Sequence, residues 1–371
     1  MKILVTGGAG FIGSHIVDEL TKDHEVVVLD NLEPQVHKRK PDYLNYGAKY
    51  IFKDVRDENS LRKALEGVEI VFHEASAVGV GQSMYQIEDY VGANTYATAK
   101  LLDFLVNEEH CIKKLIVASS MSIYGEGSYN CEDCGVVYPK LRGEKQLKER
   151  EWEMKCPNCG RVVEPEATNE DKPLRPTSIY AITKRDQEEM CLSIGIAYGI
   201  PTVALRYFNV YGPRQSLNNP YTGVCAIFSS RIKNNNPPLI FEDGIQSRDF
   251  LSVHDIVKAN ILAMEKSSAN YEFFNVGSGM SVNILNISDT LIKLYGKEGK
   301  LMPTITNKFR AGDIRHCFAD ISKIKSKLGF EPGVNFEEGM KELVDWGKGE
   351  EAEDKFDDAH KELLRKGLVE E

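Results

Sequence analysis

One tyrosine and one lysine in this sequence are spaced so that they could transfer a proton together. Tyr180 and Lys184 lie in the segment SIYAITKRDQEEM, where a helical pattern over 178–198 puts both side chains on one helix face. An ammonium group beside a phenol favours the phenolate and therefore lowers the pKa of the phenol. A tyrosine with a lowered pKa can act as a general base near neutral pH. Ser120, which ends the predicted strand 114–120, would hydrogen-bond the substrate hydroxyl that loses its proton.

A glycine-rich turn near the N-terminus has the spacing of a dinucleotide-binding site. Gly7, Gly10 and Gly13 recur at three-residue intervals in VTGGAGFIG, between a predicted strand over 2–7 and a predicted helix over 11–23. Glycines at these positions let the backbone approach a pyrophosphate, and the start of the helix favours its negative charge. The turn therefore predicts that the chain binds a nicotinamide dinucleotide.

Acidic residues at the ends of the next strands indicate which dinucleotide binds. Asp30 ends the predicted strand 25–30, where a carboxylate hydrogen-bonds the adenosine ribose and repels a 2′-phosphate, which favours NAD over NADP. Asp54 and Val55, at the end of the predicted strand 50–54, are candidate contacts of the adenine. The residues expected to bind NAD are Gly7, Gly10, Phe11, Ile12, Gly13, Asp30, Asn31, Asp54, Val55, Tyr180 and Lys184.

Four cysteines form two Cys-x-x-Cys-Gly pairs, Cys131 with Cys134 and Cys156 with Cys159. Four thiolates at this spacing suit tetrahedral zinc and leave no open position for catalysis, so a structural zinc site is predicted. Disulfides or metal-free thiols, a redox pair and a nucleic-acid-binding ribbon are the alternatives. The segment 125–172 has more acidic than basic residues, which argues against nucleic acid. Because the segment also has few apolar residues, metal binding would supply the stability that core burial cannot.

Short apolar strands that alternate with helical patterns must hold these residues in place. The alternation predicts an α/β fold, a Rossmann-type doubly wound parallel sheet with helices on both faces. Further strands are expected over 70–76 and 201–212. The expected first unit is an NAD-binding Rossmann domain over 1–212, interrupted by a zinc-ribbon-like insert over 126–172. A smaller, mainly substrate-binding lobe is expected over 213–346, with some segments returning to the first domain. A charged C-terminal helix or tail is expected over 347–371.

The overall composition limits the partners and the compartment. The 371 residues carry a net charge of −10, whereas general nucleic-acid binders usually present a basic face, so no nucleic-acid partner is expected. No apolar run is long enough to span a membrane, so no membrane partner is expected either. The N-terminus lacks the long apolar region of a signal peptide, and the other cysteines are scattered, which together indicate the cytoplasm.

Several longer motifs, taken together, have a family likeness. The glycine turn is followed in order by SSMSIYG, YAITK, LRYFNVYGPRQ, RDFLSVHDIV, FNVGSG and RAGDIRHCFADISKIKSKLGFEP. With this set the sequence resembles, from residue 1 to about 346, the extended short-chain dehydrogenases/reductases, specifically the nucleotide-sugar epimerases. The resemblance implies that Ser120, Tyr180 and Lys184 are catalytic and that Asn94 is structural. The substrate-binding residues that it implies are Ser120, Ser122, Asn209, Arg248 and Arg310, the two arginines through the diphosphate of the nucleotide sugar.

The residues directly after Ser120 bear on the reaction. Related nucleotide-sugar 4,6-dehydratases carry an Asp-Glu pair there, whereas this sequence has Met121 and Ser122, neither of which can do the acid/base chemistry of water elimination. The resemblance therefore implies a 4-epimerase that oxidises C4, lets the keto sugar rotate and reduces it from the opposite face, with NAD tightly bound and recycled. A non-catalytic NAD-sensing protein and a dehydrogenase that releases NADH are the alternatives.

Finer likenesses concern the substrate and the assembly. The segments 30–37, 76–90 and 218–232, with the cysteine-bearing insert, resemble dTDP-L-rhamnose 4-epimerases, which interconvert dTDP-L-rhamnose and dTDP-6-deoxy-L-talose. A UDP-hexose or a UDP-uronate is the alternative substrate. The resemblance also implies a homodimer built from the helices near 92–107 and 178–198.

Overall fold

The computed structural model describes residues 1–310 and 312–370, and its centre is a seven-stranded parallel sheet. The strands lie in the order β14-β9-β5-β4-β1-β2-β3, so the chain builds outward from β1 first toward one edge and then toward the other. Their bounds are β1 (Lys2–Thr6), β2 (Glu25–Asp30), β3 (Lys49–Phe52), β4 (Ile70–His73), β5 (Lys114–Ser120), β9 (Thr202–Tyr207) and β14 (Glu272–Val276). The predicted doubly wound Rossmann-type fold is confirmed.

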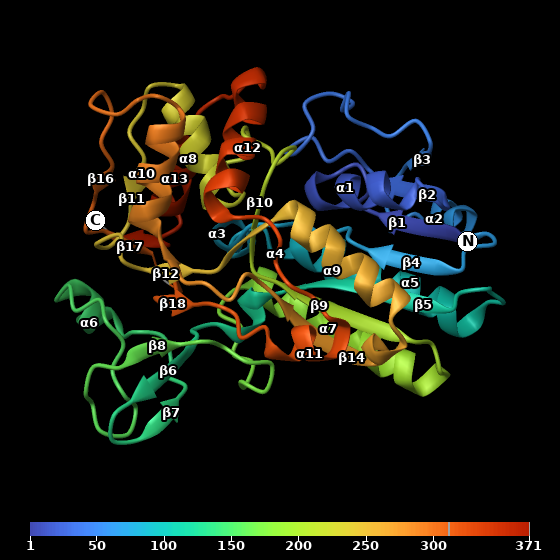
Figure 1. The fold of residues 1–371 in the computed structure, drawn as a ribbon, viewed down its shortest axis with the longest axis horizontal. Helices are drawn as coiled ribbons and strands as arrows, with labels where there is room; N and C mark the ends of the chain where they lie inside the picture. Colours follow the sequence, from blue (N-terminus) through green and yellow to red (C-terminus); the bar gives the residue numbers. More distant parts are fainter. Residues whose placement is uncertain (311, 371) are drawn as a thin grey trace.

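Alternate side chains of β1 lie in two different cores, one on each face of the sheet. Ile3 and Val5 belong to a buried cluster with helices α1, α9 and α11, and Leu4 belongs to a second cluster with α2, α5 and α7. Both faces are thus covered, which explains the nearly continuous apolar runs of the strands. The helix bounds are α1 (Phe11–Leu20), α2 (Glu58–Leu65), α5 (Ala97–Asn107), α7 (Ile179–Tyr198), α9 (Val253–Glu265) and α11 (Ser322–Leu328). Figure 1 shows α9 lying across the sheet.

A smaller lobe stands at the carboxyl edge of the sheet. Its core includes Phe228, Leu291 and Met340, one from each of three helices. These are α8 (Val224–Lys233), α10 (Ile284–Leu294) and α12 (Phe336–Gly349). Short strands complete the lobe: β10 (Asn209–Tyr211), β11 (Leu239–Ile240), β12 (Ser247–Arg248), β13 (Phe250–Ser252), β15 (Val282–Asn283), β16 (Thr304–Ile305), β17 (Phe309–Arg310) and β18 (His316–Cys317).

The single strand predicted over 201–212 is wrong, because the chain changes sheets within it. β9 ends at Tyr207 in the main sheet, and β10 begins at Asn209 and pairs in parallel with β13 of the lobe. Phe208 lies between them and donates its backbone N–H to the Val276 carbonyl at 3.0 Å. The break thus brings the chain from the cofactor side of the fold to the lobe.

The cysteine-bearing segment forms a small unit of its own. Three antiparallel strands, β6 (Ser128–Cys131), β7 (Gly135–Val137) and β8 (Glu164–Glu166), lie with a short helix α6 (Glu144–Lys148). Its core is small and includes Tyr129, Met154 and Val163 together with two cysteines. Figure 1 shows the unit projecting at the lower left, beside β12 and β18.

The charged C-terminal segment over 347–371 includes a helix, and this helix is partly buried rather than wholly exposed. Helix α13 (Phe356–Arg365) buries Ala359 and Leu363, and β19 (Val369–Glu370) pairs antiparallel with β17. The apolar residues of α13 are spaced on one face between charged residues, so the charged composition hid a face that packs on Phe241.

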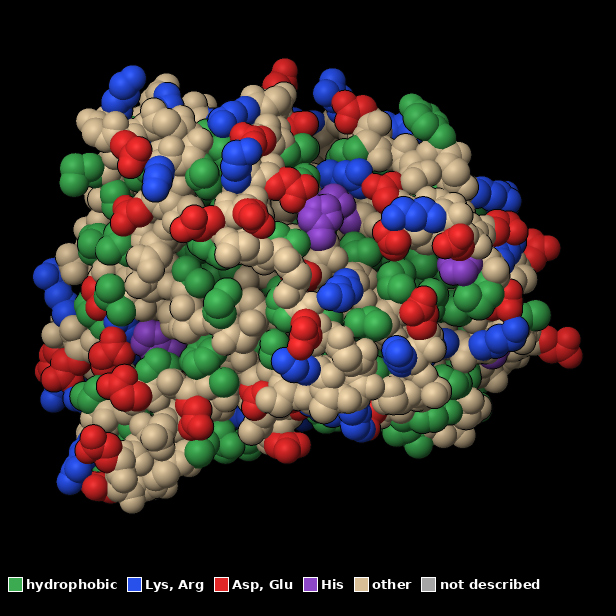
Figure 2. Space-filling model, in the orientation of Figure 1, with side chains coloured by type: hydrophobic (Ala, Val, Ile, Leu, Met, Phe, Trp, Pro, Cys, Tyr) green, Lys and Arg blue, Asp and Glu red, His purple; other side chains and the backbone are tan. Residues whose placement is uncertain are grey.

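On the face drawn in Figure 2, acidic and basic side chains are interspersed rather than gathered by sign. Within 1–310 and 312–370, no helix combines the length and the apolar character needed to cross a membrane.

Candidate active site

One cavity of about 970 Å³ lies between the carboxyl edge of the sheet and the lobe. On the side of the main sheet, which we call the cofactor end, it is lined by the glycine turn and Asp30 together with Ser120 and Tyr180. On the side of the lobe, which we call the far end, it is lined by Arg310. The carboxyl ends of parallel strands are where α/β proteins bind nucleotides. The cavity therefore brings together the residues for which the sequence predicts cofactor, catalytic and substrate roles.

The glycine turn has a geometry that other residues could not adopt. Gly7 has a φ of +69°, in the left-handed region, and a Cβ atom at Gly13 would lie 2.3 Å from the Gly7 carbonyl oxygen. Helix α1 begins at Phe11 immediately behind the turn. The turn therefore leaves room for a phosphate against a helix N-terminus, as a dinucleotide requires.

The acidic residues at the ends of β2 and β3 are held by different partners. Asp30 accepts from the backbone N–H groups of Ala9 (3.0 Å) and Leu32 (2.8 Å) at the cavity wall. Asp54 instead pairs with Arg56 at 2.8 Å, and this interaction lowers the pKa of Asp54. Asn31 also donates to Asp54 at 3.2 Å. Asp30 is thus placed where a ribose would be recognised, so this end of the cavity fits NAD.

Tyr180 and Lys184 stand in the first turns of α7, whose start is fixed by two serines. Ser178 caps the helix by accepting the N–H of Ala181 at 3.1 Å, and Ser83 accepts the N–H of Tyr180 at 3.0 Å. Lys184 donates to the Ala118 carbonyl at 2.8 Å, across to β5. The two side chains and Ser120, at the end of β5, therefore meet at the cavity wall.

The pKa values of Tyr180 and Lys184 differ from those expected of an isolated lysine–phenol pair at this spacing. Burial raises the pKa of Tyr180, and a hydrogen bond with Ser120 lowers it in part. Burial lowers the pKa of Lys184 to about 8, while the charge of Glu74 acts in the opposite direction. In this arrangement burial therefore outweighs any lowering of the tyrosine pKa by the lysine, and the Lys184 ammonium donates to a backbone carbonyl.

Sequence reasoning missed the carboxylate of Glu74, which lines the same cavity. The Tyr207 hydroxyl donates to Glu74 at 3.0 Å and accepts from Asn260 at 2.7 Å. Burial raises the pKa of Glu74 to about 7. The signal was present as an acidic residue directly after the apolar strand IVFH, at the edge where functional side chains collect.

The predicted substrate residues have unequal surroundings. Arg248 donates to the carbonyls of Ile314 (2.7 Å) and Arg315 (2.9 Å), and Arg310 donates to Asp313 at 2.9 Å and lies over the Phe241 ring. Ser122 donates to Ser120 at 2.9 Å. Asn94 donates to Thr183 at 2.9 Å and hydrogen-bonds both the N–H and the carbonyl of Ala77. The buried Oδ1 of Asn209 has no hydrogen-bond partner among the described residues.

The far end of the cavity includes residues that the sequence did not single out. Phe356, His360 and Leu363 of α13 line it, together with Leu368. His360 lies against Phe241, with ring centroids 5.8 Å apart. Nothing in the charged composition of 347–371 distinguishes these residues from the solvent-facing ones, apart from the helical spacing of the apolar side chains.

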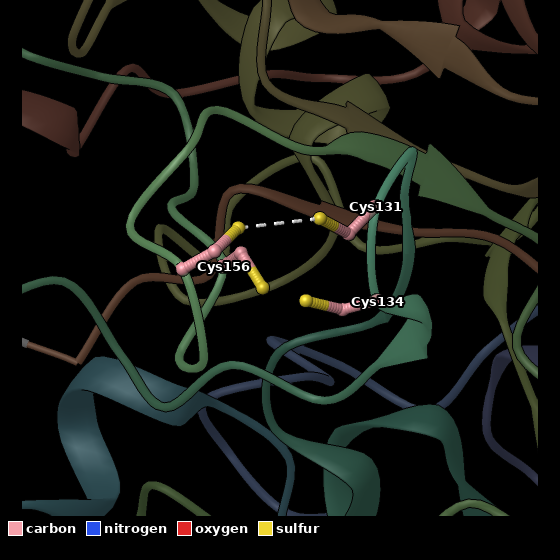
Figure 3. Close-up of side chains that lie close together, drawn as sticks. Cys131, Cys134 and Cys156 are labelled. Atoms are coloured by element: carbon pink, nitrogen blue, oxygen red, sulfur yellow. Dashed lines mark hydrogen bonds between the residues drawn. The ribbon is translucent and has the colours of Figure 1, made fainter.

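The four paired cysteines lie together at the tip of the insert, away from the cavity. One ligand atom from each lies within 4.8 Å of every other, and the Cys131 and Cys159 sulfurs are 3.6 Å apart, too far for a disulfide. Four sulfurs around zinc, with Zn–S distances of about 2.3 Å, are about 3.8 Å apart. Figure 3 shows the sulfurs turned toward a common centre. The donor set and spacing therefore fit a tetrahedral zinc site with four cysteine ligands.

Comparison with known proteins places the chain among enzymes of nucleotide sugars. The pattern of the NAD dependent epimerase/dehydratase family matches residues 3–141, and that of GDP-mannose 4,6 dehydratase matches residues 160–343. A dTDP-L-rhamnose 4-epimerase of Burkholderia thailandensis is 35% identical to this chain over 350 residues, which are 93% of this chain and 94% of that protein.

Solved structures of related enzymes have the same fold. A UDP-glucose 4-epimerase of Thermotoga maritima, solved with UDP-glucose, has a TM-score of 0.75 at 32% identity, over 94% of this chain and 99% of that one. A UDP-glucuronic acid 4-epimerase of Bacillus cereus, solved with UDP-glucuronic acid and NAD, also has a TM-score of 0.75, at 28% identity and the same coverage.

Proposed function

The chain belongs to the NAD-dependent epimerase/dehydratase family and is a nucleotide-sugar 4-epimerase, and we propose that it interconverts dTDP-L-rhamnose and dTDP-6-deoxy-L-talose. The observation that carries the proposal is a single cavity whose wall includes a dinucleotide turn, Tyr180 and two arginines. The choice of sugar is supported by the 35% identity with the Burkholderia dTDP-L-rhamnose 4-epimerase over nearly the full chain.

In the proposed reaction the protein handles one proton and orients one sugar. Bound NAD supplies the acceptor, and then the donor, of the hydride at C4. The Tyr180 oxygen takes the proton of the 4-hydroxyl group and later returns it, and Ser120 holds that hydroxyl by a hydrogen bond. Lys184, with a pKa near 8, stands one helical turn from Tyr180, and in the proposed reaction its positive charge would favour the phenolate against the burial that raises the pKa of Tyr180. The arginines at the far end hold the diphosphate while the keto sugar rotates to present its opposite face.

Dehydration is the competing chemistry, because a 4,6-dehydratase pattern matches residues 160–343. That reaction needs an acid and a base next to the catalytic serine. Met121 and Ser122 follow Ser120 here, neither of them an acid or a base, and the Ser122 hydroxyl donates to Ser120. This favours return of the hydride to C4 over loss of water. A UDP-hexose or UDP-uronate is the second candidate substrate, favoured by the UDP-sugar complexes of the structural relatives.

The proposal is tested by following the sugar H-4 coupling by proton NMR, with no NAD added. dTDP-L-rhamnose, UDP-glucose, UDP-glucuronate and UDP-N-acetylglucosamine are each incubated with purified protein. Conversion of the rhamnose compound alone supports the substrate and shows that NAD is tightly bound and recycled. Conversion of a UDP sugar instead keeps the mechanism and contradicts the rhamnose assignment, and release of a keto sugar with NADH contradicts epimerisation.

We propose further that the insert binds one structural zinc ion through Cys131, Cys134, Cys156 and Cys159. The four-thiolate set supports this role, since it leaves no coordination position for a substrate. Each of the eight cysteines, all within the described residues, is free, which agrees with the cytoplasmic location that we propose.

We also propose a homodimer that forms through the neighbouring helices near 92–107 and 178–198. Large apolar side chains are exposed on these helices, among them Tyr96 and Ile182, and directly before the first of them at Ile87 and Val91. Light scattering after size-exclusion chromatography tests the assembly. A mass near the 41.7 kDa of one chain would contradict it.

A further inference from the structure

Among the described residues, none of 126–172 lines the cavity, yet the insert is joined to the cavity's far end by buried charges. Arg142 of the insert forms a two-pronged pair with Glu242 of the lobe, with both N–O distances 2.8 Å. Glu242 also accepts from Arg315 at 3.0 Å. The side chains of Arg142, Glu242 and Arg315 are only 1%, 4% and 0% exposed.

A second link runs through Glu153, also on the insert. Its carboxylate pairs with the Arg315 guanidinium, and its other oxygen lies 3.2 Å from His316 Nε2. His316 in turn shares a 2.8 Å hydrogen bond with the hydroxyl of Ser247. Ser247 directly precedes Arg248, so this link ends beside one of the two cavity arginines.

The backbone of the same segment is fixed by the start of the insert. Glu126 accepts the N–H groups of Arg315 and His316, each at 2.8 Å. Gly127 donates to the His316 carbonyl at 2.9 Å, and a Cβ atom at Gly127 would lie 2.4 Å from that oxygen. The backbone at Gly127 and the backbone at His316 therefore lie so close together that no side chain fits between them.

Both cavity arginines depend on the segment that these contacts hold. Arg248 donates to the carbonyls of Ile314 and Arg315. Arg310 donates to the carboxylate of Asp313, and the Asp313 carbonyl accepts from Arg142 at 3.3 Å. Phe309, next to Arg310, packs in a buried cluster with Leu147 and Trp152 of the insert. The insert thus contacts the supports of both arginines without reaching the cavity itself.

Buried charges of this kind fix geometry more than they add stability. Taking ions out of water is costly, so a buried pair gains little net free energy over apolar packing, but breaking one partner leaves a charge that must find a new arrangement. Polar networks rigidify the elements that they join, and here both carboxylate oxygens of Glu242 and both terminal nitrogens of Arg142 have partners, whereas Arg142 Nε has none among the described residues. A change at Arg142 or Glu153 would therefore be transmitted to residues 309–310 and 312–316 as a change of position.

We propose that Arg142 and Glu153 are positioning residues for substrate, which set Arg248 and Arg310 where they grip the diphosphate of the nucleotide sugar. The inference rests on the proposed function, in which these two arginines bind that diphosphate. The insert would then govern substrate affinity from outside the cavity, while the hydride and proton transfers at Tyr180 proceed unchanged.

The experiment compares Arg142→Gln and Glu153→Gln with the wild-type protein in binding and in turnover. Dissociation constants for dTDP and for UDP are measured by calorimetry, and KM and kcat by NMR with the sugar that is converted. We expect weaker nucleotide binding and a higher KM by about ten-fold, less than the hundred-fold that a 1 Å misplacement can cost, with kcat within a factor of about two. The content of bound NAD should not change.

Arg161→Gln is the matched control, since Arg161 is an arginine of the same insert whose pair with Asp133 is largely exposed. It should leave binding and KM as they are. Glu153 is 41% exposed, so its variant tests the link even where Arg142→Gln does not fold. A lower melting temperature with unchanged dissociation constants and KM in the variants would overturn the proposal. Failure of the wild-type protein to bind either nucleotide would instead overturn the proposed function.

Discussion

The Tyr207 hydroxyl donates a 3.0 Å hydrogen bond to the Glu74 carboxylate, inside the cavity that Lys184 also lines. Glu74 is therefore held in place rather than free to turn to solvent. Its charge is the strongest influence that opposes the effect of burial on Lys184. The protonation of the catalytic lysine is thus linked to a residue outside the Tyr180–Lys184 motif.

The first prediction concerns pH. Lys184 has a lowered pKa of about 8, so its positive form is lost as the pH rises through that value. Glu74 has a pKa of about 7, so above pH 7 it is negative and favours the positive form of the lysine. Glu74→Gln removes that support. The alkaline limb of the kcat/KM profile should therefore move to lower pH. Glu265→Gln, on the exposed end of α9, is the control, and an unchanged limb in the Glu74 variant would contradict the link.

Tyr180→Phe should abolish the proton transfer while leaving the cofactor end of the cavity intact. We expect kcat to fall by about 10²- to 10⁴-fold, the usual contribution of a positioned acid or base. NAD released on denaturation should stay at the wild-type amount. Single-turnover NMR measures the loss, and near-normal turnover would exclude Tyr180 as the proton acceptor.

Gly13→Ala should prevent NAD binding, because the added Cβ atom would lie 2.3 Å from the Gly7 carbonyl oxygen. The measurement is the NAD content of the purified protein, together with its melting temperature. Gly143→Ala serves as the control, since a Cβ atom there has no neighbour within 4 Å and the φ angle is negative. Equal NAD contents in the two variants would count against the role of the turn.

Removal of the metal should unfold the insert. Its apolar core is small, and the free energy of zinc binding would then hold the strands together. We expect about one zinc ion per chain by elemental analysis, and a lower melting temperature after chelation or in Cys131→Ser. Cys191→Ser, at a buried cysteine of α7 outside the insert, is the comparison, and it should keep the metal. A protein purified without zinc and insensitive to chelators would refute the site.

A chain ending at residue 355 should bind substrate less tightly. It lacks Phe356 and Leu363, which line the cavity, and the strand β19 that pairs with the strand of Arg310. We expect a higher KM with little change in NAD content, because the cofactor end of the cavity is formed elsewhere. Leu363→Asp would disturb both packing and cavity contact, and Leu364→Asp packing alone, since both lie on α13 but only Leu363 lines the cavity. No change in KM on truncation would show that α13 has no part in substrate binding.

The parallel sheet and the glycine turn could be predicted because their signals are local. The strand KILVT and the glycines of the turn are read within a dozen residues, and both are found where the spacing indicates. The pairing of Tyr180 with Lys184 on α7 is local in the same way. The direction in which the Lys184 ammonium points could not be predicted locally, because the Ala118 carbonyl that accepts its hydrogen bond lies on another element, β5.

Other features depend on partners that are distant in sequence. The chain leaves the main sheet at Phe208 because β13 offers a second edge to β10, and nothing in 201–212 indicates it. The packing of α13 needs Phe241, and the buried pair of Arg142 needs Glu242. A charged residue that is buried against a distant countercharge has the same sequence signature as one that faces water.

The cavity draws on both extremes of the chain, and synthesis on the ribosome proceeds from one to the other. The turn at Gly7 and the strands β1 and β2 leave the ribosome first, whereas β14, at the sheet's edge, follows only after residue 276, and β19 later still. The glycine turn and the first six strands of the main sheet thus precede the lobe in synthesis, and β14 completes the edge of the sheet only afterwards. A nascent chain that captures NAD early would gain a folded platform on which the insert, the lobe and finally α13 could dock in turn.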